Sequence, residues 1–295
     1  LINKSYKETV GEDVNIRSAK ALAEVLENYP VTIREDELIV GSVTPTMRGC
    51  LWFPEVSDWL IDEIDTICTR EYNPTFISEE DKEYYLKEVH PYWKDRCSFA
   101  SIQKQLPDEV REKQNYGLWS CGIGMQQHVG HILSLDKHRL ERGIGWYKER
   151  AQELIDTTDK SDPQYIDKYH YWKSIIIICD AIHMFALRYS AEAKRQAEKT
   201  QNEKRKKELL LISDTLKKVP WGKPDTFYEA VQSAWFMQLI YYYENNSVAQ
   251  SPGRIDQKFY EYFKKDVIDG KELSLEAAKE ILCSYWIKIA ETNKV

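Results

Sequence analysis

The chain has 295 residues, of which 42% are hydrophobic and 30% charged, a composition typical of globular proteins and unlike that of disordered or fibrous chains. Its formal net charge is −7, with 41 basic and 48 acidic residues in mixed order, so no basic stripe could neutralise a row of phosphates and nucleic acid is not an expected partner. No apolar run approaches the roughly 20 residues needed to span a bilayer and no signal peptide opens the chain, which predicts a soluble, cytoplasmic protein with no membrane partner.

The cysteines are scattered through the chain and include no C-x-x-C pair, so the sequence predicts neither a disulfide framework nor a zinc knuckle. We expect free, mostly buried thiols at Cys50, Cys68, Cys97, Cys121, Cys179 and Cys283. The first residue is Leu1, and the residues after it enter a helical pattern without a leader. We therefore expect the chain to begin inside a longer protein.

The first 54 residues predict a helix, a short strand and a loop. Apolar residues recur at helical spacing from Ala19 to Leu26, and Pro30 ends the pattern, which predicts a helix near residues 14–28. The apolar run at 37–41 is bounded by charges and a glycine and is too short for a helix, so it predicts a buried strand. The aromatic stretch 44–54, with two prolines and a glycine, predicts an ordered loop.

A second helix is predicted from the apolar residues between Leu140 and Leu154, which step by three and four positions behind a possible cap at Asp136. Gly143 and Gly145 weaken this helix intrinsically, which favours close packing of their backbone against another chain segment.

The dipeptide Asp162-Pro163 predicts the N-cap and first turn of a long third helix. Its expected core face consists of Ile175, Ile178, Ile182, Phe185 and Tyr189. The charge-dense stretch 192–208 that follows is typical of a solvated helical hairpin.

Two further helices complete the pattern. Asp225 is the expected cap of one that carries Phe227, Trp235 and Leu239, and the other begins at Ser274 and includes Tyr285. A polar loop, 245–254, separates them. Because the chain shows no repeat and no flexible linker, we expect a single, mainly helical region with few strands.

Histidine pairs at helical spacing are candidate metal ligands, because residues three apart share one face of a helix. His128 and His131 are three apart, but they do not form the H-E-x-x-H motif. Two Asp-x-x-His pairs are also present, Asp167 with His170 and Asp180 with His183. These pairs are 13 positions apart on one predicted helix, a rotation of about 220°, so they face different sides and we expect no metal site.

Hydrolytic and nucleotide motifs are also missing. There is no G-x-S-x-G elbow, Cys121 has no basic neighbour to lower its pKa, and Gly122 and Gly124 form only a fragment of a dinucleotide fingerprint.

Several stretches, taken together and in order, resemble dehydratase-type glycyl radical enzymes of the pyruvate formate-lyase-like superfamily, of which glycerol dehydratase and trans-4-hydroxyproline dehydratase are members. The matching stretches are 34–42 (R-E-D-E-L-I-V-G-S), 53–55 (F-P-E), 129–131 (V-G-H), Asp136, 224–236, Glu244, 251–257 (S-P-G-R-I-D-Q), Asp266 and 286–288 (W-I-K). Each stretch alone is weak, but their order and spacing run over essentially the whole chain.

The resemblance implies that residues 1–295 are the N-terminal helical region of a pyruvate formate-lyase-like α/β barrel. Such enzymes pass a radical from a backbone glycine to a cysteine in a G-C-x-E setting, which then takes a hydrogen atom from the substrate. None of the six cysteines stands in that setting, and we expect both radical loops to lie beyond Val295. The resemblance therefore implies that this chain alone binds no cofactor and is inactive, with the glycyl radical on a glycine outside it. It also implies a homodimer, anaerobic metabolism and a radical S-adenosylmethionine activating enzyme as partner.

The resemblance also implies where substrate binds. The histidine that matches His131 donates a hydrogen bond to a substrate hydroxyl in glycerol dehydratase, and Gln127 and Gln250 offer further polar groups beside it. At Val248 and Ala249, where glycerol dehydratase has a His-Ser pair, this chain offers no hydrogen bond, which argues against glycerol or propane-1,2-diol as substrate.

We expect His131 and Ala249 to border one concave site although 118 positions separate them. No arginine clamp is evident nearby, which argues against an anionic substrate, and Arg254 with Asp256 is interpreted as a structural pair.

The sequence thus predicts part of an anaerobic lyase that dehydrates, or otherwise eliminates from, a small polar substrate. Two alternatives stay open. The chain could be a non-catalytic helical scaffold derived from the family, or one polypeptide of an enzyme split between two chains.

Overall fold

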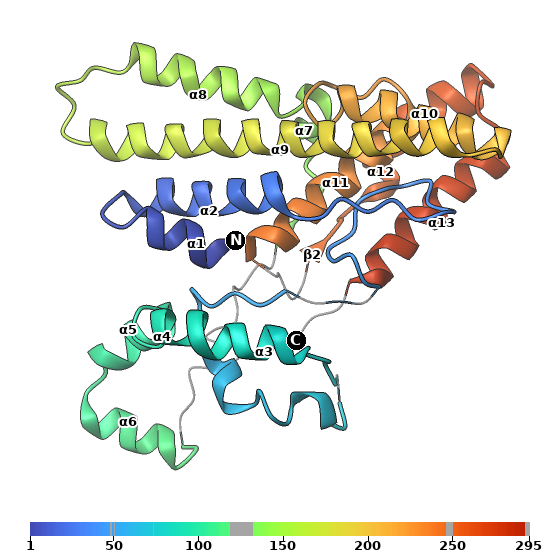
Figure 1. Ribbon diagram of the computed structural model, residues 1–295. Helices are drawn as coiled ribbons and strands as arrows, with labels where there is room; N and C mark the ends of the chain where they lie inside the picture. Colours follow the sequence, from blue (N-terminus) through green and yellow to red (C-terminus); the bar gives the residue numbers. More distant parts are fainter. Residues whose placement is uncertain (48, 50, 73, 119–131, 246–249, 293–295) are drawn as a thin grey trace. The chain divides into compact units, whose positions relative to one another are not determined.

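The computed structural model describes residues 1–47, 49, 51–72, 74–118, 132–245 and 250–292 (Figure 1). It divides into two compact units. The larger is formed by residues 1–49, 132–244 and 250–293, and the smaller by residues 50–131, 245–249 and 294–295. Within the described residues the only strands are β1 (Ile132–Leu133) and β2 (Gln250–Ser251), which confirms the predicted mainly helical fold with few strands. The α/β barrel that the resemblance implies stays a prediction.

The larger unit is built around one 35-residue helix, α9, which packs along α2, α8 and α10 (Figure 1). Its elements are α1 (Ile2–Glu8), α2 (Val14–Asn28), α7 (Lys137–Arg142), α8 (Gly145–Thr157), α9 (Tyr165–Lys199), α10 (Glu203–Lys218), α11 (Phe227–Asn245), α12 (Ile255–Phe263), the π-helical turn η5 (Lys264–Asp269) and α13 (Leu275–Glu291). The helix predicted near residues 14–28 is confirmed as α2, with Asp13 as its N-cap.

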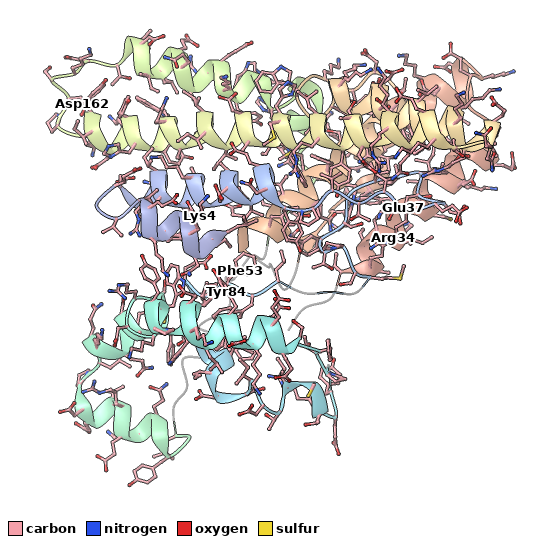
Figure 2. All side chains as sticks on the ribbon, viewed as in Figure 1. Lys4, Arg34, Glu37, Phe53, Tyr84 and Asp162 are labelled. Carbon is pink, nitrogen blue, oxygen red and sulfur yellow. The ribbon has the colours of Figure 1, made fainter. Side chains whose placement is uncertain are left out.

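The smaller unit consists of short helical pieces. They are η1 (Trp59–Asp62), η2 (Ile67–Thr69), α3 (Glu79–Tyr84), the π-helical turn η3 (Tyr85–Val89), α4 (His90–Trp93), α5 (Ser98–Gln105) and α6 (Asp108–Asn115). Phe53 and Tyr84 belong to this unit, and Lys4, Arg34, Glu37 and Asp162 to the larger one (Figure 2).

Among the described helices, α9 alone is long and apolar enough to cross a membrane by length and composition. The sequence does not reveal this as one continuous apolar run, because charged and polar residues interrupt the helix. Half of its most apolar window is buried inside the protein. Because the core helix of a soluble protein passes the same test, this is weak evidence for a membrane span.

The predicted strand at 37–41 is wrong, although the segment is as buried as a core strand. Ile39 and Val40 are almost fully inaccessible, yet no strand among the described residues pairs with them. Instead, the side-chain amide of Gln232 on α11 makes the two hydrogen bonds that a neighbouring strand would otherwise make. The Val40 N–H donates to Gln232 Oε1 at 2.9 Å, and Gln232 Nε2 donates to the Val40 carbonyl at 2.9 Å. A sequence pattern indicates that a segment is buried, but it does not indicate which groups form hydrogen bonds with its backbone N–H and C=O groups.

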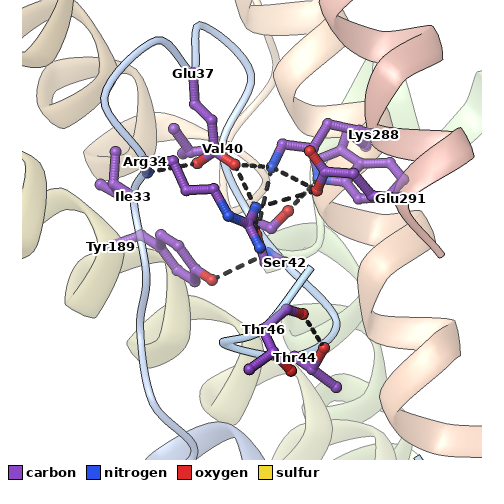
Figure 3. Close-up of polar contacts among 12 residues, drawn as sticks. Ile33, Arg34, Glu37, Val40, Ser42, Thr44, Thr46, Tyr189, Lys288 and Glu291 are labelled. Carbon is purple, nitrogen blue, oxygen red and sulfur yellow. Dashed lines mark hydrogen bonds and ion pairs between the residues drawn. The ribbon is translucent and has the colours of Figure 1, made fainter. Parts of the chain in front are cut away.

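Aromatic side chains form further hydrogen bonds with the backbone of this segment. Trp235 Nε1 donates to the Gly41 carbonyl at 3.0 Å, and Tyr228 donates to the Leu38 carbonyl at 2.6 Å. At Ser42, the backbone N–H donates to the Tyr189 hydroxyl and the carbonyl accepts from Tyr243 (Figure 3 shows the first of these). Burial raises the pKa of Tyr189 to about 12, so its hydroxyl stays protonated at neutral pH.

The helix predicted from Asp136 to Leu154 is two helices, α7 and α8. Asp136 caps the first, as predicted, by accepting from the His138 N–H. The break falls at Gly143, whose φ of 75° is accessible to glycine and strained for other residues. A Cβ at Gly143 would lie 2.3 Å from the Trp221 carbonyl oxygen, and one at Gly145 would meet the Trp221 ring. The predicted close backbone packing is therefore confirmed, and it is what ends α7.

The long helix α9 begins at Tyr165, two residues after the predicted start, because Asp162 closes a turn by accepting from the Gln164 N–H. Ile182, Phe185 and Tyr189 are buried as predicted, whereas Ile175 and Ile178 are only half-buried. The predicted hairpin at 192–208 is confirmed by α9, a short turn and α10.

The cap predicted at Asp225 is wrong by one residue. Thr226 accepts from the Glu229 N–H at 3.2 Å, and the Glu229 carboxylate accepts from the Thr226 N–H at 3.3 Å, which is a capping box. Asp225 instead pairs with Lys218 at 2.6 Å, and this hydrogen bond lowers the pKa of the Asp225 carboxyl. Ser274 caps α13 as predicted, and the predicted core residues Phe227, Trp235, Leu239 and Tyr285 are buried.

We expect Gln232→Leu to lower the free energy of unfolding by about 2–4 kcal/mol, because it leaves the buried N–H and C=O of Val40 without partners. Gln238→Leu is the matched control on the same helix. Gln238 is equally buried, but among the described residues its side chain makes a single hydrogen bond, which Oε1 accepts from the Tyr285 hydroxyl. Urea unfolding at constant m-value measures both, and equal losses would contradict the assigned role of Gln232.

Candidate functional site

Of the residues predicted to contact substrate, Gln250 is the one that the structure describes. Gln127, His131, Val248 and Ala249 lie outside the described residues, as do His128 and Cys121. The prediction that His131 and Ala249 border one concave site therefore stays a prediction.

The structure does bring the chain segments next to these residues into register. β1 and β2 pair in parallel, with Ile132 opposite Gln250 and Leu133 opposite Ser251. The Ser134 N–H extends the pairing by donating to the Ser251 carbonyl at 3.0 Å. Since parallel strands need a long crossover, this short ladder joins two segments that are remote in the sequence.

Side chains from neighbouring helices bind the two residues that directly follow β1. Arg139 on α7 donates to the Ser134 carbonyl and, at 2.8 Å, to the Tyr241 hydroxyl on α11. Lys258 on α12 donates to the Leu135 carbonyl. The ladder is thus anchored to three helices of the larger unit, which would make it a firm support for residues that touch a ligand.

The side-chain amide of Gln250 is buried without a partner. Neither Oε1 nor Nε2 makes a hydrogen bond to any described residue, and both atoms are inaccessible. Leaving such groups unsatisfied costs about 1–3 kcal/mol each. An amide can both donate and accept, so Gln250 has the chemistry to bind a hydroxyl group.

The Asp-x-x-His pairs of α9 are engaged elsewhere. Asp180 pairs with Lys148 at 2.6 Å, and His170 lies 3.4 Å from Asp13. The His183 ring packs on Trp221, with ring centroids 4.4 Å apart. Within the described part of the chain, no three His, Cys, Asp or Glu side chains are grouped closely enough to hold a metal ion.

The smaller unit contains a cluster that sequence analysis missed. The buried Asp58 carboxylate accepts from the Tyr85 hydroxyl at 2.7 Å and lies 2.5 Å from His90 Nδ1. Burial, together with the hydrogen bond to Asp58, raises the pKa of Tyr85 well above its usual range. Tyr85 is the first residue of the π-helical turn η3 and His90 directly follows the turn, and no spacing in the sequence links them to Asp58.

A second unpredicted cluster joins α13 to the segment after α2 (Figure 3). Lys288 is 2% exposed and pairs with Glu37 and with Glu291, the latter at 3.2 Å. Arg34 pairs with the same two carboxylates, at 2.7 Å to Glu37 and 3.2 Å to Glu291. Two cations thus balance two anions, as buried charges require. We call Arg34, Glu37, Lys288 and Glu291 the charge cluster.

Several of the stretches that carry the family resemblance contact one another at or near the charge cluster. Stretches 34–42 and 286–288 meet in it, and Gln232 and Trp235 of stretch 224–236 bind the same segment. Asp266 accepts from the Phe227 N–H at the start of α11. These stretches therefore join the segment after α2 to α11 and α13. Arg254 and Asp256 form an exposed bidentate pair, which fits their interpretation as structural.

A family model described as pyruvate formate lyase-like matches residues 1–295. The chain belongs to this family. Among its relatives, the isethionate sulfite-lyase of Oleidesulfovibrio alaskensis is 32% identical over 99% of this chain and 36% of its own length.

Solved structures of the pyruvate formate lyase-like family agree closely. One, on 1,2-propanediol dehydration in Roseburia inulinivorans, gives a TM-score of 0.95 at 35% identity, covering 100% of this chain and 35% of its own. The B12-independent glycerol dehydratase of Clostridium butyricum in its glycerol-bound form gives 0.94 at 37% identity, covering 100% of this chain and 37% of its own. The predicted glycyl radical enzyme family is confirmed, and this chain spans about a third of the length of such relatives.

Burial lowers the pKa of His183 below its usual value of 6.5. The unfolded chain then binds the proton more readily than the folded chain, so stability should be complete above about pH 6.5 and fall as pH falls through the folded pKa. We expect His183→Asn to lose less stability than the wild type between pH 7 and pH 5, as measured by urea unfolding at a series of pH values. Parallel curves for the two proteins would show that His183 does not contribute.

Proposed function

We propose that this chain is the N-terminal, pocket-wall region of an anaerobic glycyl radical lyase that dehydrates, or otherwise eliminates from, a small polar substrate. Its relatives include lyases and dehydratases, among them a trans-4-hydroxy-L-proline dehydratase of Clostridioides difficile. The observation that carries the proposal is the parallel pairing of Ile132 with Gln250. Each of these residues directly follows one of the two residues, His131 and Ala249, expected to border the pocket.

In this proposal the residues of the chain bind and orient the substrate. His131 would hydrogen-bond a substrate hydroxyl, and the amide of Gln250 would contribute a donor and an acceptor beside it. Hydrogen-atom abstraction would belong to a cysteine and a glycine outside the chain, since none of the cysteines here stands in G-C-x-E. The chain by itself would therefore be inactive. A radical S-adenosylmethionine activating enzyme, a homodimeric state and a cytoplasmic location belong to the proposal for the whole enzyme.

The substrate would be a small polar molecule other than glycerol. Val248 and Ala249 provide no side-chain hydrogen bond, and a substrate hydroxyl buried against them would lose about 1–3 kcal/mol. Residues 245–251 contain no arginine or lysine, which argues against an anionic group bound at this wall.

A split enzyme is the second candidate, because the chain matches only 36% of the length of its curated relatives. Purification of the chain from its source decides between the possibilities. A single longer polypeptide with G-C-x-E and a C-terminal glycine loop supports the first proposal, and a separate co-purifying polypeptide with both supports the split enzyme. If the purified protein contains neither feature and no such polypeptide co-purifies with it, the non-catalytic scaffold is the remaining possibility.

In an enzyme that contains this region and the radical residues, His131→Ala should lower kcat/KM by roughly five- to 150-fold, equivalent to about 1–3 kcal/mol, because one hydrogen bond to the substrate is lost. His138→Ala is the matched control. His138 lies in α7, 2.9 Å from the Tyr147 hydroxyl, and has no proposed contact with substrate. Steady-state kinetics with both variants folded should separate them, and equal activity of His131→Ala and wild type would remove His131 from the pocket.

Val248→His together with Ala249→Ser should raise kcat/KM for glycerol relative to the native substrate by about one to two powers of ten, because it restores two hydrogen-bonding groups. The comparison of the two substrates on one protein cancels differences in the amount of active radical. An unchanged ratio would show that these positions do not face the substrate.

A further inference from the structure

A cavity of about 250 Å³ opens between α7, the segment before α11, α12 and the turn η5. Every residue that lines it belongs to the larger unit. Its volume is close to the lower end of the range of about 300–1,000 Å³ that is usual for small-molecule sites. The proposed function makes no use of this cavity. We call it the lysine cavity after four residues of its lining, Lys137, Lys223, Lys258 and Lys265.

Cations outnumber anions in the lining of the lysine cavity. Beside its four lysines it has three carboxylates, those of Glu141, Asp225 and Glu261. Two of these carboxylates are already balanced. Glu141 pairs with Lys137 at 3.6 Å. Asp225 pairs at 2.6 Å with Lys218, which lies outside the lining. Glu261 makes no ion pair with a described residue, so it is the one lining carboxylate left to balance a lysine.

Three lysines of the lining have no carboxylate partner among the described residues. Lys258 donates to the Leu135 carbonyl, and Lys265 donates to the Asp225 carbonyl at 2.8 Å. Lys223 makes no hydrogen bond or ion pair with a described residue. Since an ammonium group has three N–H donors, each of these lysines keeps unused donors for a ligand. Three ammonium groups against one unpaired carboxylate favour a ligand with a negative charge.

Tyr262 adds an uncharged donor to the lining. Its side chain is half-buried, and its hydroxyl makes no hydrogen bond to a described residue. Burial, and to a lesser degree neighbouring carboxylates, raises the pKa of Tyr262, so its hydroxyl stays protonated at neutral pH and can donate. The ring of Tyr262, together with Leu140 and Pro224, gives the cavity an apolar part. The lining therefore suits a ligand with a charged end and an apolar body.

We propose that the lysine cavity binds a small monocarboxylate with a short apolar chain. The lining has one cation more than it has anions, which matches a single negative charge better than the nearly two charges of a phosphate. The carboxylate oxygens would accept hydrogen bonds from Lys223, Lys258 and Tyr262. The apolar chain would lie against Leu140 and Pro224. Binding of this ligand requires none of the residues assigned to the proposed function.

Lys258 connects the lysine cavity to the ladder of β1 and β2. It donates to the carbonyl of Leu135, two residues after β1. A Cβ on Gly253, two residues after β2, would lie 3.1 Å from Lys258 Nζ. The ammonium group therefore lies against both of the segments that leave the ladder. Because it has unused donors, a bound carboxylate would hold it in place without displacing Leu135, and the ladder should become more rigid.

This coupling gives the ligand a regulatory role within the proposed function. β1 and β2 directly follow His131 and Ala249, which that proposal places at the substrate pocket. A more rigid ladder would hold this wall in one position and favour substrate binding. The regulatory role rests on the proposed function, whereas binding of the carboxylate does not.

Titration of this chain with butyrate, followed by nuclear magnetic resonance of the backbone amides, tests the site. The amides of Leu140, Asp225 and Lys258 should shift saturably, with a Kd of about 1–10 mM. Butyramide has the same shape without the charge, and it should bind at least about fivefold more weakly. Inorganic phosphate has the charge without the apolar chain, and it should also bind more weakly than butyrate.

Variants that change one charge test the sign of the ligand. Lys223→Met should weaken butyrate binding by about two- to fivefold. Glu261→Gln should strengthen it by about the same factor, because it removes the unpaired carboxylate. Lys217→Met is the matched control. Lys217 is an exposed lysine of α10 outside the lining, where it pairs with Asp214, and its replacement should leave the Kd unchanged.

Hydrogen exchange of the Ser134 amide tests the coupling, because this amide donates across the ladder to the Ser251 carbonyl. Saturating butyrate should slow its exchange by at least about threefold. Lys223→Met, brought to the same occupancy with more butyrate, should keep this effect. Lys258→Met should lose it, because the link from the ligand to Leu135 is gone.

Several outcomes would overturn the proposal. Absence of saturable shifts with butyrate would reject the site. Equal binding of butyramide would reject recognition of the charge, and tighter binding of phosphate would reject the carboxylate. Weaker butyrate binding in Glu261→Gln would show that the assigned charge balance is wrong. Unchanged exchange of Ser134 at saturation would reject the coupling. The titration needs no radical, so butyrate binding by a chain that proves to be no part of a lyase would count against the proposed function alone.

Discussion

Burial of the backbone segment between α2 and the aromatic loop is the constraint on which the larger unit depends. Residues 39–42 are buried with no described strand beside them, so their peptide groups need other hydrogen-bond partners, and six N–H and C=O groups of residues 38–42 find them on side chains. Gln232, Trp235, Tyr228 and Tyr243 of α11 and Tyr189 of α9 supply them. Because each bond requires a particular residue at a particular place on its helix, the segment fixes how α9 and α11 pack.

The same segment sets the position of α13. Glu37 brings the segment to Lys288, and Arg34 extends the contact to Glu291. On the opposite side, Arg205 of α10 donates to the carbonyls of Arg34 and Glu37, so a charged residue of the solvated hairpin is buried to satisfy backbone. Four helices thus converge on one short, non-helical stretch. This gives a structural role to stretches 34–42, 224–236 and 286–288, which are among those that carry the family resemblance.

The sequence predicted the features that depend on local periodicity or a single cap. The helix at 14–28, the Ser274 cap and the buried Phe227 and Trp235 follow from patterns within one element. It failed where a distant group decided the outcome. Segment 37–41 is strand-like in burial but is paired by the Gln232 side chain, and α7 ends where Gly143 meets the Trp221 backbone. The Asp58 cluster joins residues about thirty positions apart with no motif between them. For the pocket, only family resemblance could nominate His131, since a lone histidine has no pattern of its own.

Native-state hydrogen exchange of the Val40 and Ser42 amides tests the central structural claim most directly, because their acceptors are side-chain oxygens of Gln232 and Tyr189. Both amides should exchange only through global unfolding, as slowly as the amide of Trp235 within the buried helix α11. Exchange of Val40 and Ser42 as fast as that of exposed loop amides would contradict it.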